Sequence, residues 1–301
     1  MTTDFTDAEK LMYRIIAAIC ETDAPIIFEG ALVTKLILAD NKFIDISRKT
    51  ADIDASWIGN PPTMPYLVET INRSLSAISE NLIAEAKREY GKGVSAGLKI
   101  VDTTLGETVT TMDIDIKPAK ESKLYYFGEF TIKGALPTEI LADKISVISQ
   151  KTIFRRAKDL VDVYALAHCV EIRLIDIYES HQRNGRTLGD FSEFNTRIHE
   201  IRHSYEKLRG IENKPDFESV YQYLSKFIKP FVLNCKNNEL WNPKTANWSG
   251  SPLYILQTES KKVLSAEELL KQAQMKADKH NEQRSNQKRI ALKENTEHDL
   301  L

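Results

Sequence analysis

Two short alternations of aspartate with isoleucine constrain this chain most. Asp52-Ile53-Asp54 follows directly after Arg48-Lys49-Thr50-Ala51, and Asp113-Ile114-Asp115-Ile116 comes much later. Because alternate residues of an extended chain point to the same face, the carboxylates of each pair are expected on one face; the first alternation predicts a strand or turn and the second predicts a strand. Two carboxylates on one face can hold a divalent cation, so both segments are candidates for a metal site.

Each of these aspartates, considered alone, has a simpler interpretation. Asp is common in turns, and a solvent-facing strand also alternates polar with apolar residues. The surroundings of Asp52 favour a site, because Gly30-Ala31 ends a predicted buried strand and opens a predicted helix whose backbone N–H groups can hold a phosphate. The later strand with Asp113 and Asp115 then offers a third carboxylate, as in a two-metal site. The pattern indicates phosphoryl chemistry on a nucleotide.

Apolar periodicity divides the chain into an α+β first half and a helical second half. In the first half, helices are expected over residues 8–19, 31–39 and 66–90, a buried strand at 25–30, and antiparallel strands over 96–101, 107–117 and 123–132. In the second half, helices are expected over residues 138–150, 154–181, 188–208 and 217–234. The polar stretch 265–301 predicts a solvated helix that frays into disorder. The predicted domains are therefore an α+β core at 1–135, a helical C-terminal domain at 136–260 and a polar, partly disordered tail at 261–301.

Charge and hydropathy narrow the possible partners. The 301 residues contain 41 Lys+Arg and 43 Asp+Glu, a net charge of -2, so a nucleic-acid contact would need a local basic patch.

The first ten residues lack the apolar region of a signal peptide and no apolar run approaches membrane-spanning length, so we expect a cytoplasmic protein. Cys20, Cys169 and Cys235 are far apart among apolar neighbours, which predicts buried free thiols.

Two charged residues fall on apolar stripes of consecutive predicted helices. Lys144 shares a stripe with Ile140 and Ile148, and Asp159 shares one with Val163. They can neutralise each other as a buried pair, or they can bind substrate, and both interpretations stay open. The sequence contains no GxxxxGK[ST], GxGxxG or GxSxG motif, which argues against P-loop, Rossmann and α/β-hydrolase chemistry.

In combination these motifs resemble a known family. The matching segments are Gly30-Ala31 and residues 48–54, 113–116, 136–144 and 156–163. They resemble the AbiEii/AbiGii-type nucleotidyltransferase toxins, which include abortive-infection and MenT-like toxins of the DNA polymerase β-like nucleotidyltransferase superfamily. The resemblance covers residues 10–170 and implies a polymerase β-like nucleotidyltransferase domain followed by a helical C-terminal domain. Gly30-Ala31 departs from the usual Gly-Gly or Gly-Ser, and its interval to Asp52 is longer than is common.

The resemblance also implies a role for each matching residue. Asp52 and Asp54 match the metal-binding carboxylates, and Asp115 matches the third carboxylate. Lys144 matches the lysine that contacts the nucleotide phosphates, and Asp159 matches the acidic residue of the last motif. The implied cofactor is Mg²⁺ and the implied substrate is an NTP. Several members modify the acceptor end of tRNA, and many are neutralised by a separately encoded antitoxin.

We therefore expect a Mg²⁺-dependent nucleotidyltransferase toxin of a toxin–antitoxin or abortive-infection system, with a role in phage defence. The residues expected to bind the nucleotide are Gly30, Ala31, Arg48 and Lys144. The expected acceptor is the 3′ end of tRNA, because two groups of basic residues fall near the site: Lys151, Arg155, Arg156 and Lys158, and then Arg197, Arg202 and Arg209. The alternatives are an enzyme that nucleotidylates protein hydroxyls and a catalytically inactive relative that binds a nucleotide or a protein.

Overall fold

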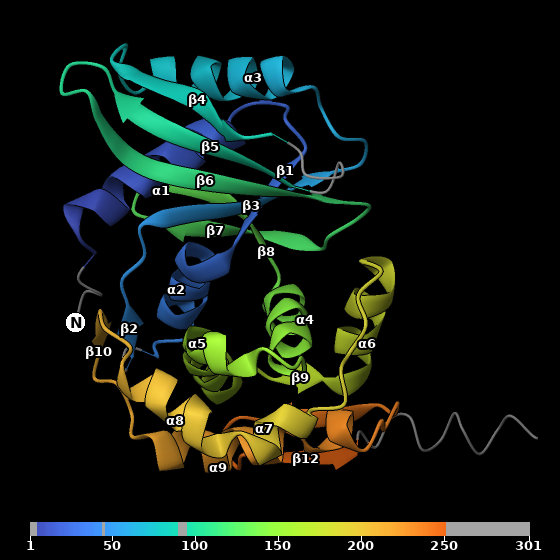
Figure 1. Cartoon of the computed structure of the whole chain (residues 1–301). Coiled ribbons are helices and arrows are strands. Elements are labelled where there is room, and N and C mark those ends of the chain that lie inside the picture. The colour runs from blue at the N-terminus through green and yellow to red at the C-terminus, as the bar shows by residue number, and fades with distance from the viewer. Residues whose placement is uncertain (1–4, 44–45, 90–94, 251–301) are drawn as a thin grey trace, which may run out of the picture. The chain divides into compact units, whose positions relative to one another are not determined.

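The computed structural model describes residues 5–43, 46–89 and 95–250, which fall within one compact unit, Met1–Gly250. In this part of the chain, seven strands form one mixed sheet and helices follow it, so the predicted α+β class is confirmed (Figure 1). The predicted tail at 261–301 lies outside the described residues. The domain boundary expected near residue 135 stays a prediction.

The sheet is built from the first half of the chain. Its strands are β1 (Ile26–Glu29), β3 (Asp52–Ile58), β4 (Leu82–Arg88), β5 (Ser95–Asp102), β6 (Glu107–Lys117), β7 (Ser122–Phe127) and β8 (Phe130–Ala135). Their order across the sheet is β4-β5-β6-β3-β1-β8-β7. β3 runs parallel to β6 and β1 runs parallel to β8, while the other neighbours are antiparallel. The two strands with alternating aspartates, β3 and β6, are therefore neighbours.

Helices of the first half cover the sheet or connect it to the rest. They are α1 (Asp7–Cys20), α2 (Gly30–Asp40) and α3 (Met64–Ser76). α1 packs on β8 and α3, and α3 packs on β4. α2 lies between the sheet and the helices of the second half, where it contacts β3, α4 and α5 (Figure 1). Its residues from Ala31 to Leu38 are all buried, as expected for a helix surrounded by other elements.

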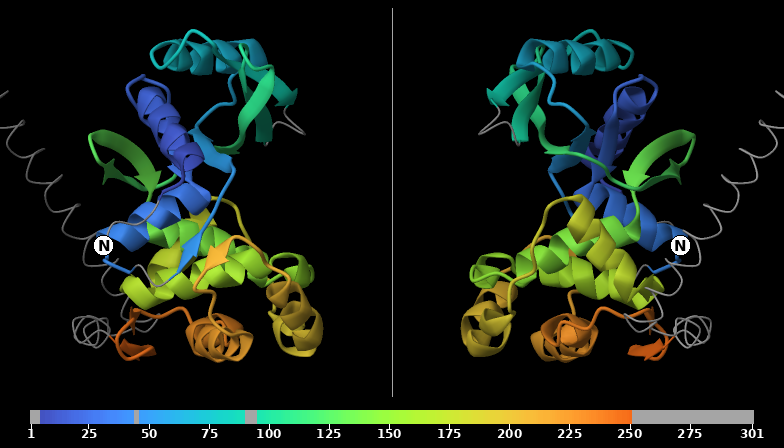
Figure 2. Two further views of the ribbon diagram at one scale, coloured as in Figure 1. Left: turned by 90° about the vertical axis from the view of Figure 1, so that its left-hand side faces the viewer. Right: turned by 90° about the vertical axis from the view of Figure 1, so that its right-hand side faces the viewer.

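The second half is mainly helical. Its helices are α4 (Pro137–Ile148), the short η2 (Ile153–Arg155), α5 (Ala157–Cys169), α6 (Leu174–Arg183), α7 (Ser192–Thr196), α8 (Ile198–Glu206) and α9 (Phe217–Val232). Strands β9 (Ile172–Arg173), β11 (Glu239–Asn242) and β12 (Asn247–Gly250) form a small sheet. Figure 2 shows these helices gathered on one side of the large sheet. β2 (Ser47–Arg48) pairs with β10 (Ile211–Glu212), which attaches the segment before β3 to the helical half.

The predicted single helix over residues 66–90 is wrong in its second part. α3 ends at Ser76, and Leu82–Arg88 forms β4, which pairs with β5. The apolar residues of this segment fit both a helical and a strand period, and pairing with β5 decides between them. Asn72 fixes the two elements together, since its side-chain amide exchanges hydrogen bonds with the backbone of Ala84 at 2.6 and 3.3 Å.

Three other predicted elements are each divided in the structure. The predicted strand 123–132 is the hairpin β7–β8, which turns at Gly128 with a φ of +56°. The predicted helix 154–181 ends at Cys169, because the chain becomes extended at Val170 and β9 pairs with β11 before α6 begins. The predicted helix 188–208 is divided into α7 and α8 at Arg197. In these places, long-range pairing or a local turn overrides the helical or strand pattern.

The remaining sequence expectations concern the thiols and the membrane. The three cysteines are free, as predicted, and each is partly buried. In the part of the chain that the structure describes, no helix is both long and apolar enough to cross a bilayer.

Candidate active site

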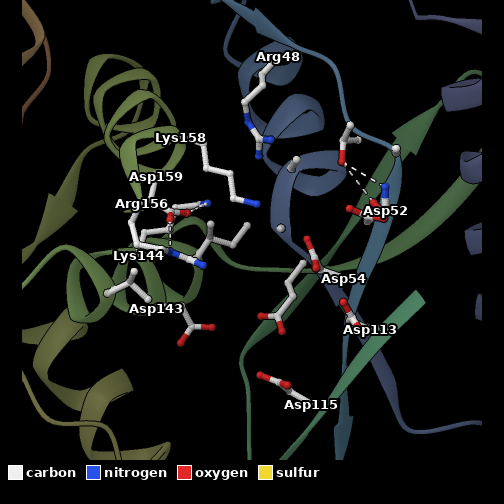
Figure 3. Close-up of a pocket in the computed structure, with 18 of the residues that line it drawn as sticks. Arg48, Asp52, Asp54, Asp113, Asp115, Asp143, Lys144, Arg156, Lys158 and Asp159 are labelled. Carbon is white, nitrogen blue, oxygen red and sulfur yellow. Dashed lines mark hydrogen bonds and ion pairs between the residues drawn. The ribbon is translucent and has the colours of Figure 1, made fainter. Parts of the chain in front are cut away.

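A cavity of about 590 Å³ collects the residues that the sequence pattern singled out. Its walls come from the sheet, from the start of α2 and from helices α4 and α5 (Figure 3). The predicted site residues that line it are Gly30, Ala31, Arg48, Asp52, Asp54, Asp115, Lys144 and Asp159. The fold thus brings all eight to one cavity, while their roles stay predictions.

One wall of the cavity carries the carboxylates of β3 and β6. The two strands are parallel, with Asp54 directly opposite Asp113. Because paired and alternate residues point to the same face, Asp52, Asp54, Asp113 and Asp115 all line the cavity (Figure 3). The sequence expectation singled out Asp115 on β6, but the register makes Asp113 the immediate neighbour of Asp54.

Asp54 differs from the other carboxylates of this wall in that no polar partner within the described part of the chain compensates its charge. Its side chain is partly buried and, among the described residues, has no hydrogen bond or ion pair. Burial is the main reason that its pKa is raised to about 6. The positive charges of Lys144 and Lys158 oppose this rise in pKa, and the negative charges of Asp113 and Asp52 add to it. A cation placed beside Asp54 would favour its ionised form.

The other three aspartates already have partners. Asp52 accepts a hydrogen bond from the Thr111 hydroxyl at 2.5 Å. Asp113 lies 3.2 Å from Nη2 of Arg88, and Asp115 lies 3.5 Å from Nζ of Lys117. All three of these contacts are at least partly exposed to solvent.

These partners bear on whether the wall fits a metal ion. Among the described residues, no three or more Asp, Glu, His or Cys side chains converge closely enough to hold one. The chemistry of the donors nevertheless suits Mg²⁺, because they are carboxylate oxygens and, among the described residues, no cation forms an ion pair with Asp54. A second aspartate of β3 or β6 would join Asp54 in holding the ion by exchanging its present hydroxyl or cationic partner for it.

The start of α2 forms the floor between the two walls. Gly30 has a φ of +72°, in the left-handed region, and is the first residue of the helix. The preceding Glu29 makes no side-chain capping hydrogen bond to the first-turn N–H groups. Gly30 and Ala31 both line the cavity, and such N–H groups at the positive end of a helix attract anions.

The opposite wall is a network of cations on two buried aspartates. Nζ of Lys144 lies 3.1 Å from Oδ1 of Asp159 and 2.6 Å from Oδ2 of Asp162. Arg48 binds Asp162 with two parallel hydrogen bonds of 3.0 Å. Nε of Arg156 lies 2.7 Å from the second oxygen of Asp159. Three cations thus share two carboxylates, and the wall keeps a net positive charge.

The Lys144–Asp159 pair was one of the two interpretations that the sequence left open, and it is present. Burial alone would lower the pKa of Lys144, but Asp162 and Asp159 raise it above its ordinary value. Burial alone would raise the pKa of Asp162, but Lys144 and Arg48 hold it below its ordinary value. Lys144 and Asp162 therefore stay ionised at neutral pH.

Sequence reasoning missed a second chain of charges beside this network. Lys120 contacts Glu29 and lies 3.0 Å from Asp143, which is also 2.9 Å from Nη1 of Arg186. On α4, Asp143 lines the cavity together with Ile140 and Val147, which are three and four residues away, so helical spacing could have found it. Lys120 and Arg186 lie in connections between elements, where no periodicity marks them.

The family of the chain follows from a sequence comparison. The family described as nucleotidyl transferase AbiEii toxin, type IV TA system, matches residues 18–223. That range is more than half of the chain and contains every predicted site residue. The chain belongs to this family of nucleotidyltransferase toxins. The expected family is thereby confirmed.

Comparison with solved structures gives more distant matches. MenT4, a nucleotidyltransferase toxin from Mycobacterium tuberculosis, aligns at 16% identity over 66% of this chain and 62% of that chain, with a TM-score of 0.35. An antigenic nucleotidyltransferase-like protein from Paracoccidioides brasiliensis aligns at 15% identity over 54% of this chain and 76% of that chain, with a TM-score of 0.37. The chain spans less than two thirds of the length of the mycobacterial toxin, and neither match bears on substrate or mechanism. Comparison with curated proteins gave no match.

Proposed function

We propose that this protein is a Mg²⁺-dependent nucleotidyltransferase toxin that transfers a nucleotide from an NTP to an acceptor hydroxyl, at the 3′ end of tRNA. The observation that carries the proposal is the division of the cavity into two walls. Carboxylates of β3 and β6 line one side, and the cations of β2, α4 and α5 line the other. A metal–triphosphate complex has the same division of charge, with a cation that requires carboxylates and phosphates that require cations.

Nucleotidyl transfer depends mainly on positioning and on neutralising charge. The acceptor hydroxyl attacks the α-phosphate, loses its proton and displaces pyrophosphate. Asp52, Asp54 and Asp115 would hold Mg²⁺, which supplies charge neutralisation and activation of the hydroxyl when it is bound. The first-turn N–H groups of α2 and the cationic wall would hold the phosphates in place.

Local charge supports RNA as the acceptor. Arg156 and Lys158 line the cavity, and Lys151 and Arg155 are exposed just before them in the chain. Such a group can bind the phosphates of an acceptor stem without reading its sequence. The second basic group, Arg197, Arg202 and Arg209, supports RNA binding less. Carboxylates already hold two of these arginines, since Arg197 lies 3.1 Å from Glu200 and Arg202 contacts Glu218.

The type IV toxin–antitoxin description of the family supports a cognate antitoxin as a partner. We extend the proposal to that partner, to action in the cytoplasm and to a role in phage defence. Co-expression with the product of a neighbouring gene, and measurement of growth with and without phage, would test this part.

A labelling experiment tests the activity. The purified protein is incubated with each α-labelled NTP, total RNA and cell extract, with Mg²⁺ or with EDTA. Labelled RNA that requires Mg²⁺ and is absent with the Asp54→Asn variant is the expected result. Label confined to protein would favour protein nucleotidylation, and NTP binding without transfer would favour the inactive relative.

A further inference from the structure

Lys158 differs from the other cations of the cavity in having no acidic partner. It is exposed, belongs to the first turn of α5 and extends toward the carboxylate wall (Figure 3). Among the described residues, no carboxylate lies within 4.0 Å of its Nζ. The other cations that line the cavity are each held by a carboxylate: Arg48, Lys49, Lys144, Arg156 and Arg186. Lys158 is therefore free to bind an anion that enters.

Lys144 is poorly placed for the same task. Its ammonium is buried and donates to both Asp159 and Asp162. Moving it onto a phosphate would leave buried carboxylates with fewer partners, and a buried charge without its partner is strongly destabilising. Lys158 has no such contact to break, because it loses only water and side-chain freedom when it binds.

The start of α5 makes an anion there still more favourable. The helix has 13 residues, and its N-cap residue, Arg156, makes no side-chain capping hydrogen bond. A lysine in the first turn of a helix is repelled by the positive end of the helix dipole, and an anion bound there relieves that repulsion. The charge of Lys158 also acts on Asp54 of the opposite wall, so its ammonium lies within electrostatic reach of the carboxylates.

We propose that the Lys158 ammonium binds the triphosphate of the nucleotide directly, and that Lys144 is a positioning residue that holds Asp159 and Asp162 in place. This inference rests on the proposed function. It assigns to Lys158 the phosphate contact that the sequence resemblance assigned to Lys144. The bound nucleotide would then lie between Lys158 and Asp54.

Calorimetric binding to the full chain tests this assignment. The ligands are each Mg²⁺–NTP, inorganic triphosphate with Mg²⁺, and a nucleoside without phosphates. Lys158→Ala should weaken NTP and triphosphate binding about 10- to 100-fold, the scale of one charge-assisted hydrogen bond. Nucleoside binding and the melting temperature should not change, and Lys158→Arg should recover part of the affinity. The matched control is Lys226→Ala, which removes an exposed lysine of α9 and should change none of these values.

Lys144→Met should show the opposite pattern to Lys158→Ala, because its main effect should be a lower melting temperature. Wild-type affinity of Lys158→Ala for inorganic triphosphate and NTP would overturn the assignment and leave the proposed function standing. Absence of NTP binding by the wild-type protein would overturn the proposed function and this inference together. Equal weakening of nucleoside and NTP binding in Lys158→Ala would overturn the assignment of Lys158 alone, because the lysine would then act on the pocket and not on the phosphates.

Discussion

The carboxylate of Asp54 occupies the space that a side chain on Gly30 would need. A Cβ at Gly30 would lie 2.0 Å from Oδ2 of Asp54, far closer than two such atoms can approach. Gly30 also has a φ of +72°, which other residues adopt only with strain. The glycine at the start of α2 is therefore required by the carboxylate beside it and by its own backbone, in addition to any approach of a nucleotide.

Gly30→Ala should displace Asp54 and abolish nucleotide transfer. The left-handed backbone by itself makes an alanine cost about 1–2 kcal/mol, and the overlap with Asp54 adds to this. Gly106→Ala is the matched control, because Gly106 has a φ of +67° and no atom lies within 4 Å of the position that its Cβ would occupy. Both variants should lose stability in denaturant unfolding, but only Gly30→Ala should lose transfer of labelled nucleotide. Equal activity of the two folded variants would contradict the link between Gly30 and Asp54.

Asp54 should make the stability of the metal-free protein depend on pH. Its pKa in the folded protein is about 6 against an ordinary 3.8, so the folded state binds the proton more tightly. The resulting stabilisation is complete below about pH 4 and is lost as the pH rises through about 6, a change of about 3 kcal/mol. Asp54→Asn removes this loss, so the variant should be more stable than wild type at pH 8 and similar at pH 4.

Denaturant unfolding of both proteins at pH 4 and pH 8 without divalent cations measures the difference. Added Mg²⁺ should stabilise the wild-type protein at pH 8 and should have little effect on Asp54→Asn. A stability difference between the two proteins that is the same at both pH values would show that Asp54 titrates normally.

Local patterns were enough to predict some elements and the faces of key residues. The alternation over Glu107–Lys117 predicted β6 with its observed bounds, because a half-buried strand has a period of two. The separate alternation Asp52-Ile53-Asp54 predicted that the two aspartates share a face, as they do on β3. On α4 and α5, a lysine and an aspartate on apolar stripes left a buried pair open beside substrate binding, and the structure contains the pair.

The contacts that arise from distant parts of the chain were not predictable in this way. The parallel register that sets Asp113 opposite Asp54 depends on the pairing of β3 with β6, and neither strand specifies it alone. Asp162 is held by Arg48, which precedes it by 114 residues and reaches it because β2 pairs with β10. The helix expected over 66–90 failed for the same reason, because pairing with β5 makes its second part a strand.

Lys144 should contribute mainly to the stability of the folded protein. Lys144→Met keeps the bulk of the side chain and removes the charge between Asp159 and Asp162, and the loss of one partner from a buried ion pair costs about 3–5 kcal/mol. Arg48 and Arg156 remain as partners of the two aspartates, so the lower end of this range is expected. Thermal and denaturant unfolding measure the loss.

A double-mutant cycle separates this effect from a change in packing. Lys144→Met combined with Asp159→Asn should be less destabilised than the sum of the single variants, because the second change removes a carboxylate that the first leaves short of a partner. Strict additivity would show that the two side chains do not interact.

The choice of third carboxylate can be tested on β6. We expect Asp115→Asn to abolish transfer, in accordance with the family motif, while Asp52→Asn and Asp54→Asn do the same on β3. Asp113→Asn is the matched variant, since Asp113 and Asp115 lie on the same face and are similarly exposed, at 49% and 45% of the side chain. Loss of transfer in Asp113→Asn with retention in Asp115→Asn would assign the third carboxylate to the residue opposite Asp54.

Labelling of RNA should depend on the exposed cations beside the cavity. Reversal of Lys151 and Arg155 to Glu places negative charge where an acceptor stem would approach, so RNA labelling should weaken and should fall steeply with added salt in the wild-type protein. NTP binding should be unchanged, because neither residue lines the cavity. The control reverses Lys133 and Lys226 to Glu, which changes the net charge equally at exposed positions outside the cavity lining. Labelling that responds to neither salt nor the first pair of reversals, or that responds equally to both pairs, would contradict an RNA acceptor at this surface and would favour a protein hydroxyl.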